Sequence, residues 1–321
     1  MKSITIGKLR GLQRITSSRG TFTCLALDHR QNLRKALNPP DPASVSDVDL
    51  SRFKLEVCAA LADLGTAVLL DPEFSAAQAV AAGAVPGNVG LVVALESTGY
   101  GGGPAARKSQ ILPGWSVEKA KRMGADAVKL LVYYHPDAPT ASEIEAFIRQ
   151  IAAECRQQDL CLMLEPLSYP LDPAAKKLSS DEKRAVVTGT ARRLTIPGVD
   201  VLKAEFPLEI AEDPDENHWA AACAEISAAS PVPWIVLSAA VDYATYTRQV
   251  EIACRLGASG SAVGRAVWQE AVTMRGQERL DFLRTTGRQR LSRLTALCSE
   301  QAKPVSDFYT ADAPFDWYTT Y

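Results

Sequence analysis

The chain has 321 residues, 47% of them hydrophobic, and a formal net charge of −2. A chain of this length can bury a large core, while the near-neutral charge provides no basic surface for nucleic acid or an anionic membrane. No stretch reaches the roughly 18 apolar residues of a membrane span, and the N-terminus has no signal-peptide pattern, so we expect a cytoplasmic protein.

The seven cysteines are odd in number and scattered, mostly inside apolar runs, without a C-x-x-C pair. This pattern argues against a disulfide framework and a zinc site. We interpret the cysteines as reduced core residues.

Apolar and helical segments alternate along the chain. Residues 5–15 are typical of a short amphipathic helix, and a turn follows at 17–20. Buried strands are then predicted at 23–28, 66–71, 89–95, 127–132, 160–165, 199–207, 233–238 and 260–264. Helices are predicted at 48–63 and 75–82, from 116, at 141–158, 180–194, 215–229 and 243–256, and from 265 onward, and a glycine-rich loop follows the third strand through 104.

Eight apolar strands that alternate with helices predict an α/β fold, a single (β/α)8 TIM barrel, over roughly the 250 residues typical of that fold. The glycines of Gly99-Tyr100-Gly101-Gly102-Gly103 lack the dinucleotide-binding spacing. We therefore expect one domain over 1–321, with the barrel at about 21–275 and a C-terminal helix and tail at 276–321.

The tail is rich in aromatic residues, namely Phe308, Tyr309, Phe315, Trp317, Tyr318 and Tyr321. Disordered tails are poor in aromatic residues, so we expect this one to pack on the barrel or across a subunit contact. The sequence leaves both arrangements open.

Lys203 lies near the end of the sixth predicted strand. A buried ammonium without a partner is costly, and a lysine in that position tends to lose its proton and become a nucleophile for carbonyl carbon. The alternative is a lysine that reaches solvent at the strand end or pairs with Glu205.

Catalytic groups of TIM barrels lie at the carboxyl ends of the strands. The polar residues at those ends are Asp28, Asp71, Glu96, Lys129, Glu165, Lys203, Ser238 and Arg265. Lys129 and Lys203 belong to alternate strands, which contribute to the same interior layer, so the two amines are expected to face each other. A second cation lowers the pKa of a lysine and favours a Schiff-base nucleophile.

Glu165 ends the fifth predicted strand and is placed to carry protons during addition of an amine to a ketone. Its alternative role is a salt bridge to either lysine without catalysis. Asp28 is expected to orient a lysine or a substrate hydroxyl.

The last two strands predict an anion site made by Ser238, Gly264 and Arg265. Glycine lets a backbone N–H approach an anion, arginine adds a charged fork, and barrels often bind phosphate at these loops. The alternative is a turn glycine beside an arginine paired to a surface carboxylate. Metal-dependent cleavage competes with the Schiff-base route, but the chain has only three histidines, His29, His135 and His218, so we expect no metal and no other cofactor.

The chain resembles the class I tagatose 1,6-bisphosphate aldolases over most of the barrel. The resemblance rests on an ordered set of segments: 26–28, 69–72, 96–100, 115–117, 124–131, 165–166, 200–203, 237–238 and 264–268. It implies that Lys203 forms the imine, that Glu165 and Lys129 assist proton transfer, that Asp28 lies in the site, and that Ser238, Gly264 and Arg265 hold a phosphate. The implied substrate is D-tagatose 1,6-bisphosphate, a small-molecule ketose bisphosphate, and we expect a homo-oligomer.

A sister branch, the sulfofructosephosphate aldolases, is similar through the same lysine, serine and arginine. The 97–100 loop and the aromatic tail resemble the tagatose branch more. Both branches usually have glutamine after the first-strand aspartate, where this chain has His29, which we place among the substrate-binding residues. A barrel that binds sugar phosphate without turnover is the alternative from another functional class.

Overall fold

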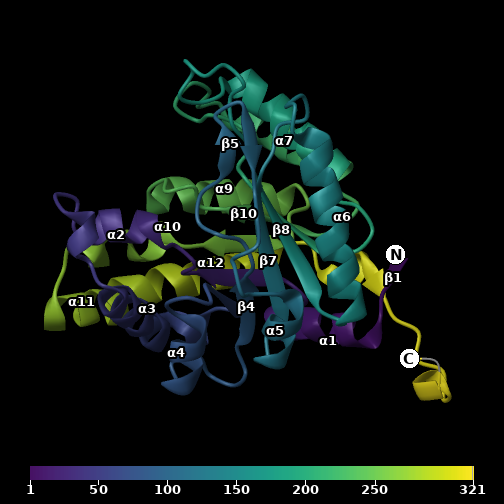
Figure 1. Ribbon diagram of the computed structural model, residues 1–321, viewed down its shortest axis with the longest axis horizontal. Coiled ribbons are helices and arrows are strands. Elements are labelled where there is room, and N and C mark those ends of the chain that lie inside the picture. Colours follow the sequence, from purple (N-terminus) through teal and green to yellow (C-terminus); the bar gives the residue numbers. More distant parts are fainter. Residues whose placement is uncertain (320) are drawn as a thin grey trace.

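The computed structural model describes residues 1–319 and 321. Eight parallel strands form a closed barrel in chain order, and the last strand pairs with the first. The strands are β2 (Phe22–Ala26), β3 (Ala67–Leu70), β4 (Gly90–Ala94), β7 (Ala127–Tyr133), β8 (Cys161–Leu167), β9 (Val201–Ala204), β10 (Trp234–Leu237) and β11 (Gly260–Val263). Figure 1 shows β4, β7, β8 and β10 among them, with helices around them. The predicted TIM barrel is confirmed, and each predicted strand is present.

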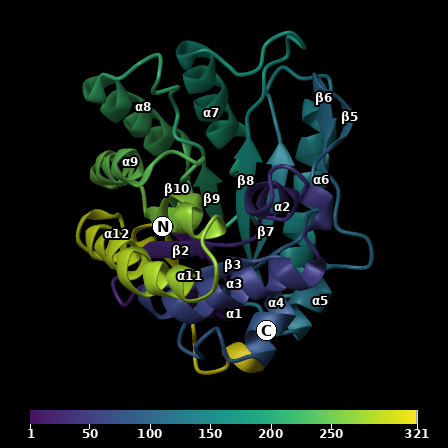
Figure 2. The ribbon, with the colours of Figure 1, turned by 90° about the vertical axis from the view of Figure 1, so that its left-hand side faces the viewer.

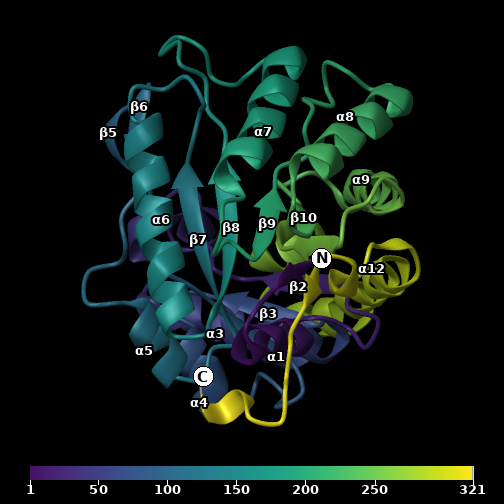
Figure 3. The same ribbon diagram turned by 90° about the vertical axis from the view of Figure 1, so that its right-hand side faces the viewer.

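Helices surround the barrel, as Figures 2 and 3 show from opposite sides. They are α1 (Ile6–Ile15), α2 (Gln31–Leu37), α3 (Asp47–Leu61), α4 (Ala76–Ala81), α5 (Val117–Arg122), α6 (Ala141–Gln157), α7 (Ser180–Leu194), α8 (Glu216–Ala229), α9 (Tyr243–Arg255), α10 (Arg265–Trp268), α11 (Gly276–Phe282) and α12 (Arg288–Gln301). Capping boxes at Ser46 and Ser179 explain why α3 and α7 begin close to their predicted starts.

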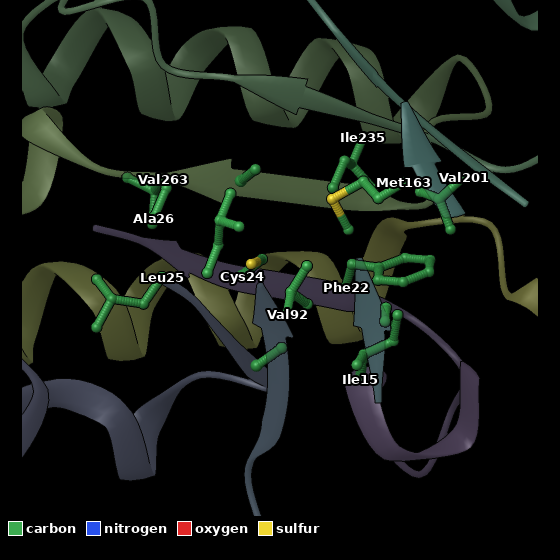
Figure 4. Close-up of a cluster of buried hydrophobic side chains, with 14 of the residues drawn as sticks. Ile15, Phe22, Cys24, Leu25, Ala26, Val92, Met163, Val201, Ile235 and Val263 are labelled. Atoms are coloured by element: carbon green, nitrogen blue, oxygen red, sulfur yellow. The ribbon is translucent and has the colours of Figure 1, made fainter. Parts of the chain in front are cut away.

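The N-terminal helix α1 closes the amino-terminal end of the barrel. A Cβ at Gly11 would lie 2.7 Å from the Asp126 carbonyl oxygen, so glycine lets the helix approach β7 closely. Ile15 of α1 joins the buried cluster that contains Phe22, Met163 and Ile235 from three different strands (Figure 4). Because the core and α1 fill this end, the opposite end, where the strands finish, is left for a site.

Two elements near that opposite end differ from the prediction. The expected glycine-rich loop, through 104, contains the exposed strand β5 (Gly101–Gly103), which forms a hairpin with β6 (Ala106–Lys108) beyond the loop, and α2 was not predicted. Three consecutive glycines carry no apolar alternation, and α2 has no side-chain hydrogen bond at its N-cap. Neither element therefore has the sequence pattern on which such predictions depend.

The first part of the aromatic tail packs on the barrel, one of the two predicted arrangements. Strand β12 (Tyr309–Thr310) pairs with β1 (Lys2–Ser3), and the Tyr309 hydroxyl donates to the Asp200 carbonyl oxygen at 2.7 Å. Phe315 and Tyr318 are exposed. The subunit contact and the homo-oligomer stay predictions. Within the described part of the chain, no helix is both long and apolar enough to cross a membrane.

Candidate active site

A cavity of about 330 Å³ opens at the carboxyl ends of the barrel strands. All eight predicted site residues line it: Asp28, His29, Lys129, Glu165, Lys203, Ser238, Gly264 and Arg265. The structure therefore brings together side chains that are distributed over more than two hundred positions of the sequence. Asp71, which also ends a strand, instead forms a fully buried ion pair with Lys54 outside the cavity lining.

Lys203 projects into the cavity from β9. Its side chain is 4% exposed, and its Nζ lies 2.8 Å from Glu165 Oε1. The amine neither reaches bulk solvent nor pairs with Glu205, whose Oε2 accepts the Ser168 N–H at 2.6 Å. Both alternatives for this lysine are therefore wrong.

The Glu165 carboxylate lies between the two lysines. Its second oxygen, Oε2, is 3.3 Å from Lys129 Nζ, so one carboxylate connects both amines. This buried oxygen accepts no hydrogen bond from any described residue. A buried acceptor that has an ion-pair contact but no hydrogen bond is unusual in a folded protein, and it leaves this oxygen available to a hydroxyl group of a bound molecule.

Lys129 is enclosed by three carboxylates. Its Nζ lies 2.7 Å from Asp28 Oδ2 and also contacts Glu96 and Glu165. Burial alone would lower the pKa of Lys129, but the three carboxylates outweigh burial and raise its pKa above the ordinary value. Lys129 is therefore a permanent cation at neutral pH.

The pKa of Asp28 shifts in the opposite direction to that of Lys129. Burial favours its neutral form, but Lys129, and then Lys203, outweigh that effect and hold the pKa of Asp28 well below its usual range. Asp28 is accordingly ionised, and it fixes the position of Lys129 through their ion pair.

Glu96 belongs to the same network, although it was not among the predicted site residues. It accepts from Lys129 Nζ through Oε1 and from the Leu131 backbone N–H through Oε2 at 3.0 Å. Its place at a strand end was visible in the sequence. The contact with Lys129 depends on the pairing of β4 with β7, which a single sequence does not reveal.

The loops after β10 and β11 form a cradle beside Lys203. The Gly264 N–H is directed to Ser238 Oγ at 3.4 Å, and Ala239 and Ala240 have positive φ angles of 41° and 64°. Two alanines in the left-handed region are uncommon and mark a loop held by its surroundings.

Arg265 supplies the positive charge of this cradle. Its guanidinium is half-buried and forms no ion pair with any described carboxylate. The alternative, in which Arg265 pairs with a surface carboxylate, is therefore wrong for the described residues. Burial lowers the pKa of Arg265, which nevertheless remains charged at neutral pH. A charged fork beside a glycine N–H and a serine hydroxyl suits a phosphate group.

His29 lies between the Lys129 network and this cradle. Its ring packs edge-on against Trp268 at 5.3 Å, and a Cβ at Gly264 would come within 3.1 Å of its Cε1. Burial, followed by the Arg265 and Lys203 charges, outweighs Asp28 and lowers the pKa of His29 to about 4. The imidazole is therefore neutral at physiological pH.

The other histidines lie outside the cavity. His135 Nδ1 accepts the Asp137 N–H, and His218 pairs with Asp213. Across residues 1–319 and 321, no group of three or more His, Cys, Asp or Glu side chains is arranged to hold a metal ion.

Comparison with known proteins gives consistent results. The profile described as "DeoC/LacD family aldolase" matches residues 23–270. A "Tagatose 1,6-diphosphate aldolase" of Listeria monocytogenes is 33% identical over 95% of both chains. A "Tagatose 1,6-diphosphate aldolase 2" of Enterococcus faecalis is 31% identical over 94% of this chain and 96% of the relative.

Solved structures share the fold at lower identity. An archaeal fructose 1,6-bisphosphate aldolase is 23% identical, with a TM-score of 0.59 over 91% of this chain and 99% of that one. The fructose-bisphosphate aldolase of Plasmodium falciparum has a TM-score of 0.70 at 14% identity, over 94% and 98% of the two chains. The profile match and the 33% identity over nearly the whole length establish the family: this chain belongs to the DeoC/LacD family of aldolases.

Proposed function

We propose that this chain is a class I, Schiff-base aldolase that cleaves D-tagatose 1,6-bisphosphate to dihydroxyacetone phosphate and D-glyceraldehyde 3-phosphate. The observation that carries the proposal is the Glu165 carboxylate. One of its oxygens lies 2.8 Å from Lys203 Nζ, and the other has no hydrogen-bond donor among the described residues. The names of the Listeria and Enterococcus relatives support the choice of substrate.

Lys203 is the proposed nucleophile. The amine passes a proton to the Glu165 carboxylate and adds to the C2 carbonyl carbon, and Glu165 returns that proton when the carbinolamine loses its hydroxyl as water. The product is a protonated imine, which withdraws electrons from C3. The 2.8 Å contact between the amine and the carboxylate gives the proton a direct route.

Glu165 then accepts the proton of the C4 hydroxyl. The C4–O bond becomes a carbonyl, the C3–C4 bond breaks, and its electron pair enters the enamine on Lys203 as glyceraldehyde 3-phosphate leaves. Protonation at C3 and addition of water to the imine release dihydroxyacetone phosphate and restore the lysine. Lys129 keeps a positive charge next to Glu165 throughout, and Asp28 holds Lys129 in place.

The cradle of Ser238, Gly264 and Arg265 is the proposed site for the C1 phosphate. It lies on β10 and β11, the two strands that follow β9 around the barrel. C1 is bonded to C2, the carbon that Lys203 attacks, so a phosphate on C1 belongs next to this strand. His29, neutral and adjacent to Gly264, limits the space around it.

Reductive trapping tests the nucleophile. Sodium borohydride added with dihydroxyacetone phosphate should attach one reduced triose phosphate to Lys203, located by peptide mass spectrometry. Lys203→Ala should remain unlabelled, while Lys8→Ala, which removes a buried lysine at the far end of the barrel, should label as the parent does. Label on Lys203→Ala would overturn the assignment.

Substrate comparison tests the reaction. We expect sustained release of both triose phosphates from tagatose 1,6-bisphosphate in a coupled assay. A preference of more than about tenfold in kcat/KM, about 1.4 kcal/mol, for 6-deoxy-6-sulfofructose 1-phosphate would assign the chain to the sulfofructosephosphate branch. Binding of the bisphosphate without release of trioses would identify a sugar-phosphate-binding barrel instead.

A further inference from the structure

A second cavity, of about 220 Å³, lies beside the catalytic one. Four cationic side chains and two carboxylates line it: Arg107, Lys176, Lys177, Lys183, Glu205 and Glu209. Lys177 pairs with Glu209 at 3.8 Å and with Glu212 at 3.2 Å. This pairing leaves three cations and one carboxylate, Glu205, in the lining, so the cavity retains an excess of positive charge.

Three of the cations have no ion-pair partner among the described residues, namely Arg107, Lys176 and Lys183. Among the described residues, the Lys183 ammonium donates only to the Leu208 carbonyl oxygen, at 3.3 Å, and the Arg107 Nε donates to the Pro104 carbonyl oxygen at 3.1 Å. Unpaired cations gathered around a cavity attract an anion. Arg30, which lines the catalytic cavity, differs because it pairs with Glu73 at 3.0 Å.

Arg107 is held in place by stacking on aromatic rings. Its guanidinium carbon lies 4.5 Å from the centre of the Tyr100 ring and 4.4 Å from that of Tyr169. Such packing fixes the guanidinium plane and reduces the side-chain freedom lost when a ligand binds. The buried Tyr169 hydroxyl also lacks a hydrogen-bond partner within the described chain.

The two cavities adjoin along the Glu205 side chain, which lines both. Tyr133, another lining residue of the catalytic cavity, lies 5.4 Å from the Arg107 guanidinium. In the ring of eight strands β7, which bears Tyr133, is four places from β11, whose end holds the C1 phosphate cradle. The basic cavity is lined by residues that follow β8 and β9, such as Tyr169 and Glu205, whereas the cradle follows β10 and β11, so the two lie over different parts of the barrel mouth.

We propose that this basic cavity binds the C6 phosphate of the substrate, with Arg107 and Lys183 as its principal ligands. The inference rests on the proposed function, in which a ketohexose bisphosphate is held at C2 by Lys203. A substrate whose C1 phosphate lies in the cradle then extends its C6 end towards the basic cavity. A guanidinium suits a terminal phosphate because its N–H groups match two phosphate oxygens. Arg107 and Lys183 thus select substrates that carry an anion at both ends.

A comparison of two substrates distinguishes binding of the C6 phosphate from a general effect on catalysis. Arg107→Ala should lower kcat/KM for the ketohexose 1,6-bisphosphate by about ten- to a hundredfold, the effect of losing a hydrogen bond to a charged group. It should change kcat/KM for the corresponding ketohexose 1-phosphate by less than about twofold. Lys183→Ala should have the same selective effect.

Lys108→Ala is the matched control. Lys108 is the neighbour of Arg107 on β6, pairs with Glu143 at 2.8 Å and does not line the cavity. We expect it to leave both substrates unaffected. Equal losses on both substrates in Arg107→Ala and Lys183→Ala would overturn the inference, while borohydride labelling of Lys203 would continue to support the Schiff-base function. If the sulfonated analogue is lost in parallel with the bisphosphate, the cavity recognises either terminal anion.

Discussion

Replacement of Lys129 by methionine tests the charge network at the centre of the site. The substitution keeps most of the side-chain volume and removes the ammonium from a position that is 1% exposed. Asp28 would lose a 2.7 Å partner, and Glu96 and Glu165 would lose the same cation. Of these three carboxylates, only Glu165 would then keep an ion-pair contact within the described part of the chain, with Lys203.

The expected loss of stability follows from what each carboxylate keeps. Glu165 retains Lys203 at 2.8 Å, and Glu96 retains the Leu131 N–H at 3.0 Å. Asp28 has no other ion pair among the described residues. Breaking a buried ion pair costs about 3–5 kcal/mol, so we expect Lys129→Met to lower the free energy of unfolding by about 4 kcal/mol at pH 8. That is a large part of the roughly 5–15 kcal/mol available to a folded protein.

The loss should depend on pH with a definite sign. In the parent protein Lys129 overcomes burial and depresses the pKa of Asp28, which contributes stability above the unfolded pKa of about 3.9. Without Lys129, we expect burial to outweigh the remaining cations and to raise the pKa of Asp28 above that value. Stability of the variant is then retained at low pH and lost as pH rises through the raised pKa. The deficit should therefore be smaller at pH 5 than at pH 8.

Urea unfolding of the parent and Lys129→Met at both pH values measures this difference. The double variant Asp28→Asn with Lys129→Met removes the uncompensated charge and should recover stability at pH 8. Lys8→Met, which breaks the buried pair with Asp200 at 2.6 Å, should lose comparable stability and keep its aldolase activity, whereas Lys129→Met should lose it. Equal unfolding free energies of parent and Lys129→Met at pH 8 would refute the account of the network.

Three further outcomes are expected. Glu165→Gln should lower kcat by about 10²–10⁴-fold, while borohydride still labels Lys203 at equilibrium, and unchanged turnover would exclude Glu165 as the proton carrier. Gly264→Ala should lower kcat/KM by about tenfold, because its Cβ would lie 3.0 Å from a backbone oxygen; Gly87→Ala, with nothing within 4 Å, is its control. His29→Gln should leave the pH–rate profile unchanged between about pH 6 and 9, since the pKa of His29 is about 4 and glutamine is also neutral; a shifted profile would show that the imidazole titrates in this range.

The barrel could be predicted from the sequence because its strands are buried on both faces. A run such as Ala127–Tyr133 is continuously apolar around Lys129, and turn residues separate it from the next helix. The β5–β6 hairpin could not be predicted, since Gly101–Gly103 is exposed and is held only by backbone pairing with Ala106–Lys108. That hairpin carries Arg107, so the residue on which the C6 phosphate proposal depends lies between the expected loop, which ends at 104, and the helix expected from 116, where no element was predicted.

The catalytic candidates could be predicted because position at a strand end is itself a chemical signal in this fold. Strand ends alone, however, do not separate Asp71 from Glu96. Asp71 forms an ion pair with Lys54 of α3 outside the cavity, whereas Glu96 contacts Lys129 across two paired strands. Which carboxylate meets which amine depends on strand register and helix packing, and a single sequence contains neither.

The structure also bears on which of the two buried lysines acts as nucleophile. Imine formation requires a neutral amine. Lys129 is surrounded by Asp28, Glu96 and Glu165, which raise its pKa, and so it keeps its proton at neutral pH. Among the carboxylates of the described residues, only Glu165 lies within ion-pair distance of Lys203. Lys129 is therefore suited to hold charge beside the carboxylate that moves protons, and Lys203 is the amine suited to attack the ketone.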